Sequence, residues 1–574
     1  MKKLNTKKLL LFCAVFLSSY MYAQENNPIS LQKRLPLKAG EKLPAYNSKF
    51  NPTLKTKANA LAPVSVSDGV DVRILPSSNV QSEVMITINK QNPLNLLASA
   101  NTLVGPLSYN QGFYTSFDGG ATWSGSDILQ NIAGNKIAGD PSVAFSADGT
   151  AFMTTIGLGL FSSSGYWFQR STDGGQNWST GIKGNTTANF DKDMIAADNL
   201  TTSPFANNFY CAWTDFNSGN GAVAFNRSTD KGITFSTKIQ LRSGAIGFGQ
   251  GTNVQTGPNG EVYVCWADHT TVVSPFEADG MGFAKSTDGG VTFTPASVIF
   301  PYAGTRVDAT SSTYNFTRVN DFPSMAVDKS NTAKRGRIYI TYPEKNATGN
   351  SVIKVRYSDN QGTTWSAGKV VSIANAREAF FPWITVDDAT GIVWVTYYAL
   401  DQATGYATNT YVAGSVNATR WVNLKVSDVS HITAPIDNTN FAAGYAGDYI
   451  GIAANGLKAY PTWMDNRNGT WQVYCSTVTV TPSFAQEMQA PEITSTQSSS
   501  KLTVNPNPFN SVIHITLSNT EIASAQLYNQ SGKLIKQWIT TNGELAVAEV
   551  PKGIYFIKVT GKDGKIYTQN IIKK

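Results

Sequence analysis

Ser116-Phe117-Asp118-Gly119-Gly120-Ala121-Thr122-Trp123 is the first of five copies of one eight-residue pattern. Each copy has serine first, Asp or Asn third, glycine fifth and Trp or Phe last. The third positions are Asp118, Asp173, Asp230, Asp288 and Asn360, so successive copies lie 55, 57, 58 and 72 residues apart. A repeat of this length with strand-like flanks is typical of one four-stranded propeller blade per copy.

The residue types of the pattern predict a tight turn. An Asp side chain accepts hydrogen bonds from backbone N–H groups a few residues later. Glycine adopts backbone conformations that a Cβ disfavours, and the final aromatic ring is large enough to fill the space between blades. The residues assigned to this structural role are Asp118, Gly120, Trp123, Asp173, Gly175, Trp178, Asp230, Gly232, Asp288, Gly290, Asn360, Gly362 and Trp365.

This pattern resembles the Asp-box, or bacterial neuraminidase repeat (BNR repeat), family. The resemblance implies a sialidase-like β-propeller whose Asp-box turns are structural and lie on the face opposite the active site. The fold class that we predict is therefore all-β, an Asp-box β-propeller followed by a small C-terminal β-sandwich.

A second recurring signature counts the blades. Inner strands start near Glu83, Asp140, Asp191, Gly251, Asp321, Phe381 and Asp448, which favours seven blades, with six as the alternative. The sixth unit has a turn one residue short, at residues 415–421, and the seventh has no turn after it. We expect residues 70–74 to supply the missing outer strand of the seventh blade, because closing the ring removes a free sheet edge.

The two ends of the chain predict export. Residues 1–23 read as a signal peptide, with Lys2, Lys3, Lys7 and Lys8 before an apolar run. Residues 24–63 are expected to be a mostly irregular leader, residues 64–483 the propeller and residues 484–501 a Gln-, Ser- and Thr-rich linker.

Residues 502–574 read as short alternating strands separated by glycine turns, which predicts a small β-sandwich. The segments at 505–509, 525–533, 553–559 and 567–573 resemble the C-terminal type A sorting domain of the type IX (Por) secretion system of Bacteroidetes. The resemblance implies the type IX secretion machinery as a partner and a secreted, extracellular or outer cell-surface location. The alternative is an accessory binding sandwich.

Composition argues against a nucleic-acid partner and against a transmembrane segment. Only 15% of the 574 residues are charged, and no Arg/Lys cluster with interleaved aromatics is present, so we expect no nucleic-acid partner. No later stretch is apolar for 18 residues, so no transmembrane segment is expected. Cys211, Cys265 and Cys475 are interpreted as small buried hydrophobes, with a disulfide as the alternative.

Carboxylates and aromatic rings are expected together at the channel mouth. In a propeller, the loops that enter the inner strands and those that leave the second strands share one face. This places Glu83, Asp140, Asp191, Asp193, Asp321 and Asp448 with Trp213–Asp215, Trp266–Asp268, Tyr342–Glu344 and Trp463–Asp465, and with His269. Aromatic faces stack on sugars and paired carboxylates do acid–base work; the structural alternative is that the acids bind loop N–H groups. A Ca²⁺ site stays open, because hard oxygen ligands suit this ion, although no Asp-x-Asp-x-Asp-Gly loop occurs.

The sialidase resemblance implies three arginines on a substrate carboxylate, a Tyr nucleophile with a Glu partner, and an Asp acid/base. Arginine suits the first role because its planar fork binds carboxylates bidentately. The nearest match to the family's Arg-Ile-Pro motif is Arg73-Ile74-Leu75-Pro76, with one residue inserted. The catalytic candidates are Arg73, Arg318, Arg377, Tyr449, Asp140, Asp215 and Asp268, with Arg306 as a further mouth arginine. Tyr445 and Tyr449, which flank Asp448, are the candidate nucleophiles, and the substrate-binding candidates are Trp213, Trp266 and Trp463.

Two functions of different class follow. The first is a sialidase-like glycoside hydrolase that acts on extracellular glycans. It requires at least two of Arg73, Arg306, Arg318 and Arg377 to converge at the mouth beside a Tyr–Glu pair. The second is a non-catalytic propeller, an adhesin or surface module that binds glycan or protein.

Overall fold

A computed structural model describes residues 66–104, 109–129, 131–132, 136–158, 163–185, 189–436, 444–481, 502–518, 520–529, 533–539, 543–562 and 566–574. The chain divides into two compact units, Met1–Gln489 and Ala490–Lys574, which are described separately. The expected signal peptide (1–23), leader (24–63) and linker (484–501) lie outside the described residues. The described residues are all-β, and none of them belongs to a helix that could cross a membrane.

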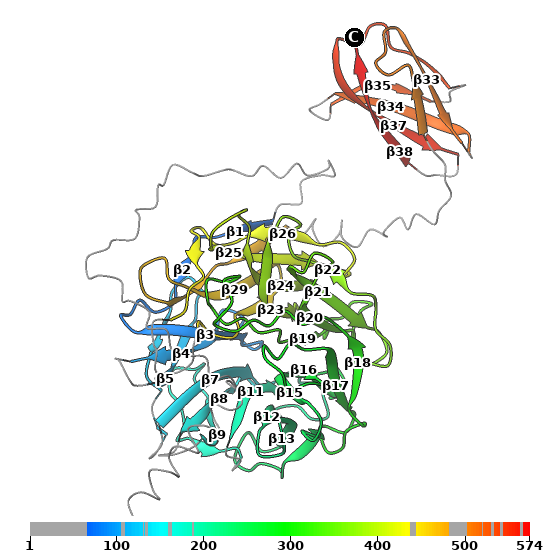
Figure 1. Ribbon diagram of the computed structural model, residues 1–574. Coiled ribbons are helices and arrows are strands. Elements are labelled where there is room, and N and C mark those ends of the chain that lie inside the picture. Colours follow the sequence, from blue (N-terminus) through cyan, green and yellow to red (C-terminus); the bar gives the residue numbers. More distant parts are fainter. Residues whose placement is uncertain are drawn as a thin grey trace, which may run out of the picture. The chain divides into compact units, whose positions relative to one another are not determined.

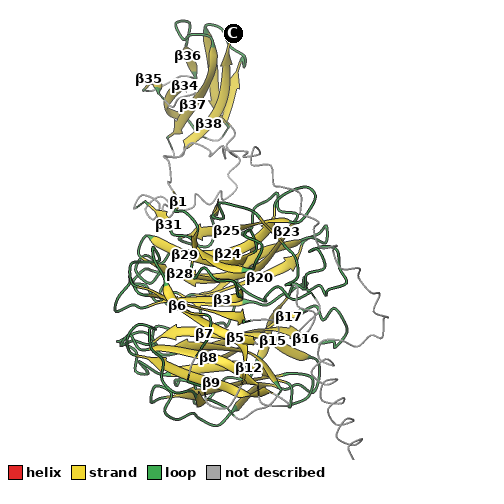
Figure 2. Ribbon diagram, turned by 90° about the vertical axis from the view of Figure 1, so that its left-hand side faces the viewer, coloured by secondary structure: helices red, strands yellow, loops and turns green. Residues whose placement is uncertain are grey.

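The first unit is a ring of seven antiparallel sheets, the blades (Figures 1 and 2). Blades 1 to 6 each run from the innermost strand outwards in chain order. Blade 1 contains β3 (Val80–Ile88), β4 (Leu96–Leu103), β5 (Tyr109–Ser116) and β6 (Ser124–Ser126); blade 2 contains β7 (Lys136–Phe145), β8 (Ala151–Leu158), β9 (Ser163–Ser171) and β10 (Ile182–Lys183). Blade 3 contains β11 (Phe190–Ala197), β12 (Phe209–Asp215), β13 (Ala222–Ser228) and β14 (Ile239–Arg242); blade 4 contains β15 (Phe248–Thr256), β16 (Val262–His269), β17 (Gly280–Ser286) and β18 (Ser297–Pro301).

Blade 5 contains β19 (Ser324–Val327), β20 (Ile338–Lys345), β21 (Ser351–Ser358) and β22 (Lys369–Val370); blade 6 contains β23 (Glu378–Val386), β24 (Val393–Leu400), β25 (Ala407–Ser415) and β26 (Val422–Lys425), with β27 (His431–Ile432) added beside β25. The inner strands β3, β7, β11, β15, β19, β23 and β28 contact one another in this order, and β28 returns to β3. Figure 1 labels β3, β7, β11, β15, β19 and β23 in the ring. The ring is therefore closed.

Blade 7 joins the two ends of the propeller. It contains β28 (Gly451–Asn455), β29 (Lys458–Asp465), β30 (Gln472–Cys475) and β31 (Val478–Val480), together with β1 (Val66–Asp68) and β2 (Val72–Arg73). Strand β2 pairs antiparallel with β30, Val72 opposite Cys475, and β1 pairs with β31. The predictions of seven blades and of an outer strand drawn from residues 70–74 are confirmed.

The eight-residue pattern forms one turn geometry in all five copies. In the first copy the Gly120 N–H donates to Ser116 Oγ at 2.9 Å, and the Thr122 N–H donates to Asp118 Oδ1 at 2.9 Å. The Trp123 indole N–H closes the turn on the Gly120 carbonyl at 3.1 Å. Gly120 has a φ of +87°, a conformation that favours glycine. The shortened sixth copy keeps the turn with Ala418 at a φ of +61°.

The core lies between neighbouring blades, and the closing aromatic rings of the turns fill it. Phe293 packs edge-on against Phe225 of the preceding blade, with ring centroids 4.8 Å apart, and Phe235 meets Phe168 at 5.5 Å. Trp365 meets Phe283 in the same way at 5.6 Å. Cys211, Cys265 and Cys475 are buried and unpaired, as predicted.

The second unit is a small two-sheet sandwich. One sheet contains β32 (Leu502–Asn505), β33 (Val512–Leu517) and β36 (Glu544–Ala546); the other has the order β35 (Leu534–Trp538), β34 (Ile522–Asn529), β37 (Gly553–Gly561) and β38 (Ile566–Lys573). Apolar side chains from both sheets, among them Phe509, Ile515, Leu527 and Ile557, form its core.

Candidate functional site at the channel mouth

A repeated β-bulge aims side chains into the channel mouth. Five inner strands break register near their start, and the bulges begin at Glu83, Asp140, Lys192, Gly251 and Phe381. All five of these residues have positive φ, between 50° and 65°. Such bulges redirect side chains next to functional sites, and here they gather charged groups from separate blades on the ring axis.

The ammonium of Lys192 is the centre of a buried ion cluster. Its Nζ lies 2.8 Å from Asp448 Oδ2, 3.0 Å from Asp140 Oδ1 and 3.3 Å from Glu83 Oε1. Arg318 Nη2 donates to both carboxylate oxygens of Asp448, at 3.0 Å to Oδ2 and 3.1 Å to Oδ1. We call these five residues, Glu83, Asp140, Lys192, Arg318 and Asp448, the central ion cluster.

The acids of the central ion cluster differ in the direction of their pKa shifts. Burial raises the pKa of Glu83 well above its usual range, and the carboxylates of Asp140 and Asp448 add to the effect despite Lys192. Burial also opposes ionisation of Asp448, but Arg318 and Lys192 outweigh it and hold the pKa of Asp448 well below its usual range. Lys192 likewise lowers the pKa of Asp140 against the effect of burial. Within one cluster the pKa of Glu83 is therefore raised, whereas those of Asp140 and Asp448 are lowered.

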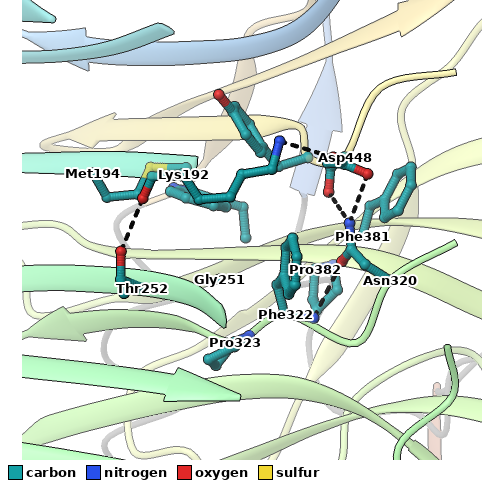
Figure 3. A pocket seen from close by; sticks show the side chains of 12 residues that line it. Lys192, Met194, Gly251, Thr252, Asn320, Phe322, Pro323, Phe381, Pro382 and Asp448 are labelled. Carbon is teal, nitrogen blue, oxygen red and sulfur yellow. Dashed lines mark hydrogen bonds and ion pairs between the residues drawn. The ribbon is translucent and has the colours of Figure 1, made fainter. Parts of the chain in front are cut away.

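A small cavity adjoins the central ion cluster. Its volume is about 10 Å³, and it is lined by Lys192, Asp448, Phe322, Phe381 and neighbouring residues (Figure 3). A cavity of this size is at the lower limit for a single water molecule. A sugar ring cannot enter this cavity.

Beside the central ion cluster, Asp191, Gln250 and Arg306 form a more exposed chain of hydrogen-bonded side chains, which we call the polar relay. The Gln250 amide donates to Asp191 Oδ2 at 2.8 Å, and Arg306 Nη1 donates to Gln250 Oε1 at 2.9 Å. Asp191 and Arg306 are partly exposed, and the Arg306 guanidinium lies over the Phe276 ring at 5.8 Å. Burial and the neighbouring Asp140 carboxylate raise the pKa of Asp191 to about 7. Asp191 can therefore hold a proton near neutral pH, the property of a general acid.

Arg306 differs from Arg318 in its partners. Among the described residues Arg306 has no carboxylate within ion-pair distance, whereas Arg318 is bound to Asp448. Burial, reinforced by repulsion from Arg318, lowers the pKa of Arg306. Its remaining N–H donors suit an incoming carboxylate or other anionic group.

A tyrosine and a glutamate meet at the same mouth. The Asn101 amide donates to Tyr445 Oη at 3.0 Å and to Glu83 Oε2 at 2.8 Å, and the ring of Tyr445 lies under Arg318 at 5.5 Å. Burial and Glu83 raise the pKa of Tyr445 well above its usual range. A nucleophilic phenol needs the opposite shift, so this pair is a poor match to a tyrosine nucleophile.

The other sequence candidates lie away from the mouth or inside the fold. Arg73 lies on β2, the outer strand of blade 7, and donates to Gln472 Oε1 at 2.8 Å. Arg377 donates to the Gly405 carbonyl. Tyr449 is buried, with its hydroxyl on the Pro141 carbonyl at 3.2 Å and its pKa raised by burial. Of the four arginines, the structure brings Arg306 and Arg318 to the mouth.

The aromatic-x-acid pairs form a structural motif. The Trp266 indole N–H donates to Asp268 Oδ2 at 2.8 Å, and Trp463 donates to Asp465 at 3.1 Å. Each acid is paired with a cation: Lys238 with Asp215, Arg242 with Asp268, Lys354 with Glu344, and Arg467 with Asp465. Trp213, Trp266 and Trp463 are buried between the blades, so the structure corrects their assignment to sugar stacking.

The remaining mouth acids have structural surroundings. Asp193 is fully buried with its pKa raised by burial, and Asp321 accepts from the Ala278 N–H at 2.7 Å with its pKa raised by burial to about 6. His269 is buried against Phe248, with ring centroids 3.9 Å apart. Within the described residues, no group of three or more His, Cys, Asp or Glu side chains is arranged to hold a metal ion.

Sequence reasoning missed Lys192, Gln250 and the role of Asn101. One signal was available for Lys192: the run Asp191-Lys192-Asp193 places three charges at the start of a strand that is otherwise apolar. Gln250 and Asn101 carry no such signal, because single amides in strands are common.

Comparison with known proteins identifies the second unit. Residues 503–574 match the family model described as "Secretion system C-terminal sorting domain". This unit is a type IX sorting domain. The protein is accordingly secreted, to the extracellular side of the cell surface.

The propeller resembles several solved structures at low identity. A protein of unknown function from Dyadobacter fermentans is 13% identical, with 72% of this chain and 99% of that chain covered and a TM-score of 0.42. The Hadza microbial sialidase Hz136 is 16% identical, with 56% and 63% covered and a TM-score of 0.38. An α-L-arabinanase of Penicillium chrysogenum is 13% identical, with 58% and 94% covered and a TM-score of 0.41. No curated protein sequence matches the chain.

Proposed function

We propose that the propeller is a carbohydrate-active module that binds an acidic extracellular glycan above the central ion cluster and cleaves it by acid catalysis. Asp191 is the general acid, Arg306 binds the acidic group of the glycan, and Gln250 fixes the spacing between them. The observation that carries the proposal is the partly exposed Asp191–Gln250–Arg306 relay. In it, a carboxyl with a pKa of about 7 and an arginine that has no carboxylate partner among the described residues face the same mouth.

The chemistry assigned to Asp191 follows from its surroundings. A glycosidic bond breaks when an acid protonates the leaving oxygen. Below pH 7 Asp191 retains its proton, because burial and the Asp140 carboxylate both disfavour its ionisation. Asp140 is ionised beside it and is the candidate for the second carboxylate of the reaction. The sialidase-type alternative, with Tyr445 as the nucleophile, is disfavoured by the raised pKa of that phenol.

The test is turnover by the purified full-length chain on fluorogenic glycosides that include a sialoside, a uronide and neutral sugars. We expect release from an acidic glycoside, with kcat/KM falling as pH rises above about 7, because Asp191 then loses its proton. Asp191→Asn should lower kcat about 100-fold or more, and Arg306→Gln should raise KM for the acidic substrate selectively. Asp148→Asn, a half-exposed acid in a different part of the blade surface, is the matched control. Turnover that survives Asp191→Asn would refute the assignment.

The second candidate function is a non-catalytic glycan-binding propeller. It is favoured by the small size of the cavity beside the central ion cluster, about 10 Å³. Binding of an acidic glycan that Arg306→Gln abolishes, without turnover on any substrate by a folded protein, would establish this function in place of the first.

A further inference from the structure

The outer face of the four-stranded sheet in the sorting domain is apolar at one end and polar at the other. Alternation along β37 turns Tyr555, Ile557 and Val559 into the core and leaves Ile554 and Phe556 outside. Cross-strand pairing then places Ile572 opposite Ile554, and Tyr528 opposite both Phe556 and Leu534. These five residues, Leu534, Tyr528, Ile554, Phe556 and Ile572, are called the apolar end.

The residues of the apolar end are contiguous and accessible. Directly opposite residues on one sheet face have Cβ atoms about 5 Å apart. Leu534 is 43% exposed, Ile554 44%, Phe556 40% and Ile572 45%. Isolated exposed apolar residues are ordinary, but a contiguous patch marks a surface that another molecule covers.

The other end of the same face is polar. There Gln537, Gln526, Lys558 and Thr568 lie in register across the four strands. Ile566 is 51% exposed on this side, and the residue opposite it is Thr560, so it has no apolar partner across the strands. The apolar character is therefore local and is not a general property of the sheet.

Unpaired lysines flank the apolar end. Residues 502–574 contain eight lysines against four acidic residues. Lys536 and Lys562 form ion pairs with Glu549 and Glu521. Lys533, Lys552 and Lys574 are adjacent to or two residues from Leu534, Ile554 and Ile572, and no ion pair of theirs occurs among the described residues. A partner that covers the apolar end meets a basic rim.

We infer that the apolar end is the surface by which the type IX secretion machinery recognises this protein, through a partner protein with an apolar contact area and an acidic rim. The match of residues 503–574 to a sorting domain supports this occupant, because a sorting domain is recognised during export. The lysines beside the apolar end are the reason for expecting an acidic rim on the partner, since rim charges steer association and suppress wrong partners. Figure 2 shows β34, β35, β37 and β38, the strands that carry this face.

The test is export of the full chain from cells that carry a type IX secretion system. The variant Ile554→Ser/Phe556→Ser should lower the exported fraction at least tenfold, with the uncleaved chain accumulating in the periplasm. Ile566→Ser, the matched control of similar exposure, and Phe556→Leu, which keeps the surface apolar, should be exported like the wild type. Reversal of the rim by Lys533→Glu/Lys552→Glu/Lys574→Glu should also reduce export, whereas Lys562→Glu should not.

Several outcomes would overturn the inference. Wild-type export of the double serine variant would do so directly. Ile572→Thr keeps a β-branched side chain in the strand. Normal export of this variant, with residues 502–574 still resistant to protease, would also overturn the inference. Binding of the wild-type chain to vesicles containing anionic lipid, lost in the double serine variant, would assign the apolar end to a membrane surface. A dimer in solution that the same variant dissociates would assign it to a second copy of the chain.

Discussion

Replacement of Lys192 by methionine tests the role of the central ion cluster. The Lys192 ammonium is buried and contacts Glu83, Asp140 and Asp448 from three other blades. In Lys192→Met, Asp448 keeps Arg318, but Asp140 loses the only cation within ion-pair distance among the described residues. Breaking a buried ion pair by removing one partner costs about 3–5 kcal/mol. We expect the free energy of unfolding at pH 7 to fall by this amount.

The pH dependence of this loss has a defined sign. The pKa values of Asp140 and Asp448 are lowered in the folded protein, so their stabilisation is present above the unfolded value near 3.8. It is lost as pH falls through the folded values. The difference between wild type and Lys192→Met should therefore be largest at neutral pH and shrink below about pH 4.

Urea denaturation followed by tryptophan fluorescence measures this difference, with Lys231→Met as the control. Lys231 pairs with Asp148, and both side chains are about 40% exposed, so the same substitution there should cost less than about 1 kcal/mol. Equal stability of the two variants at pH 7 would refute the reasoning, as would a Lys192→Met deficit that does not change with pH.

Two further stability predictions come from the turns and from a buried histidine. Gly232→Ala should cost about 2–5 kcal/mol, because Gly232 has a φ of +80° and a new Cβ would lie 2.0 Å from the Phe168 ring; Gly349→Ala, with a φ of +86° and no atom within 4 Å, should cost only about 1–2 kcal/mol in the same urea titration. Burial lowers the pKa of His431 to about 4. Between pH 6.5 and 4 the unfolded chain therefore binds a proton at this histidine that the folded protein does not bind, so the free energy of unfolding falls as pH falls. From pH 7 to pH 5 this amounts to about 2 kcal/mol, which His431→Phe should remove; urea midpoints that shift equally in both proteins would contradict it.

The fold could be predicted from the sequence because its signals are local and repeated. Ser116, Asp118 and Gly120, which form the hydrogen bonds of the turn, can be recognised in the sequence. The spacing of the copies then gives the number of blades. The closing strand at Val72–Arg73 was predictable because the seventh unit lacked an outer strand. Each of these inferences needs only spacing and residue type.

The site was less predictable because its contacts join distant blades. Lys192 meets Glu83, Asp140 and Asp448, and no spacing in the sequence announces these pairs. The aromatic-x-acid ends were found correctly as a pattern, but their function depends on partners such as Arg242 and Arg467, which turn the acids into structural ion pairs. A motif that recurs in several blades has a structural role in each blade. Asp191, Gln250 and Arg306 occur together once, so no repeat in the sequence points to them.

The pairing of Val72 with Cys475 determines when the propeller ring can close. These residues are 403 positions apart (475 − 72), so the strand that closes the ring is made early and its partner late. Joining ends this far apart costs about 5 kcal/mol of chain entropy. Until residues 472–475 are available, blade 7 lacks the strand on which β2 forms. The ring therefore cannot close until nearly the whole propeller has been made, and an exported chain keeps an incomplete seventh blade until that point.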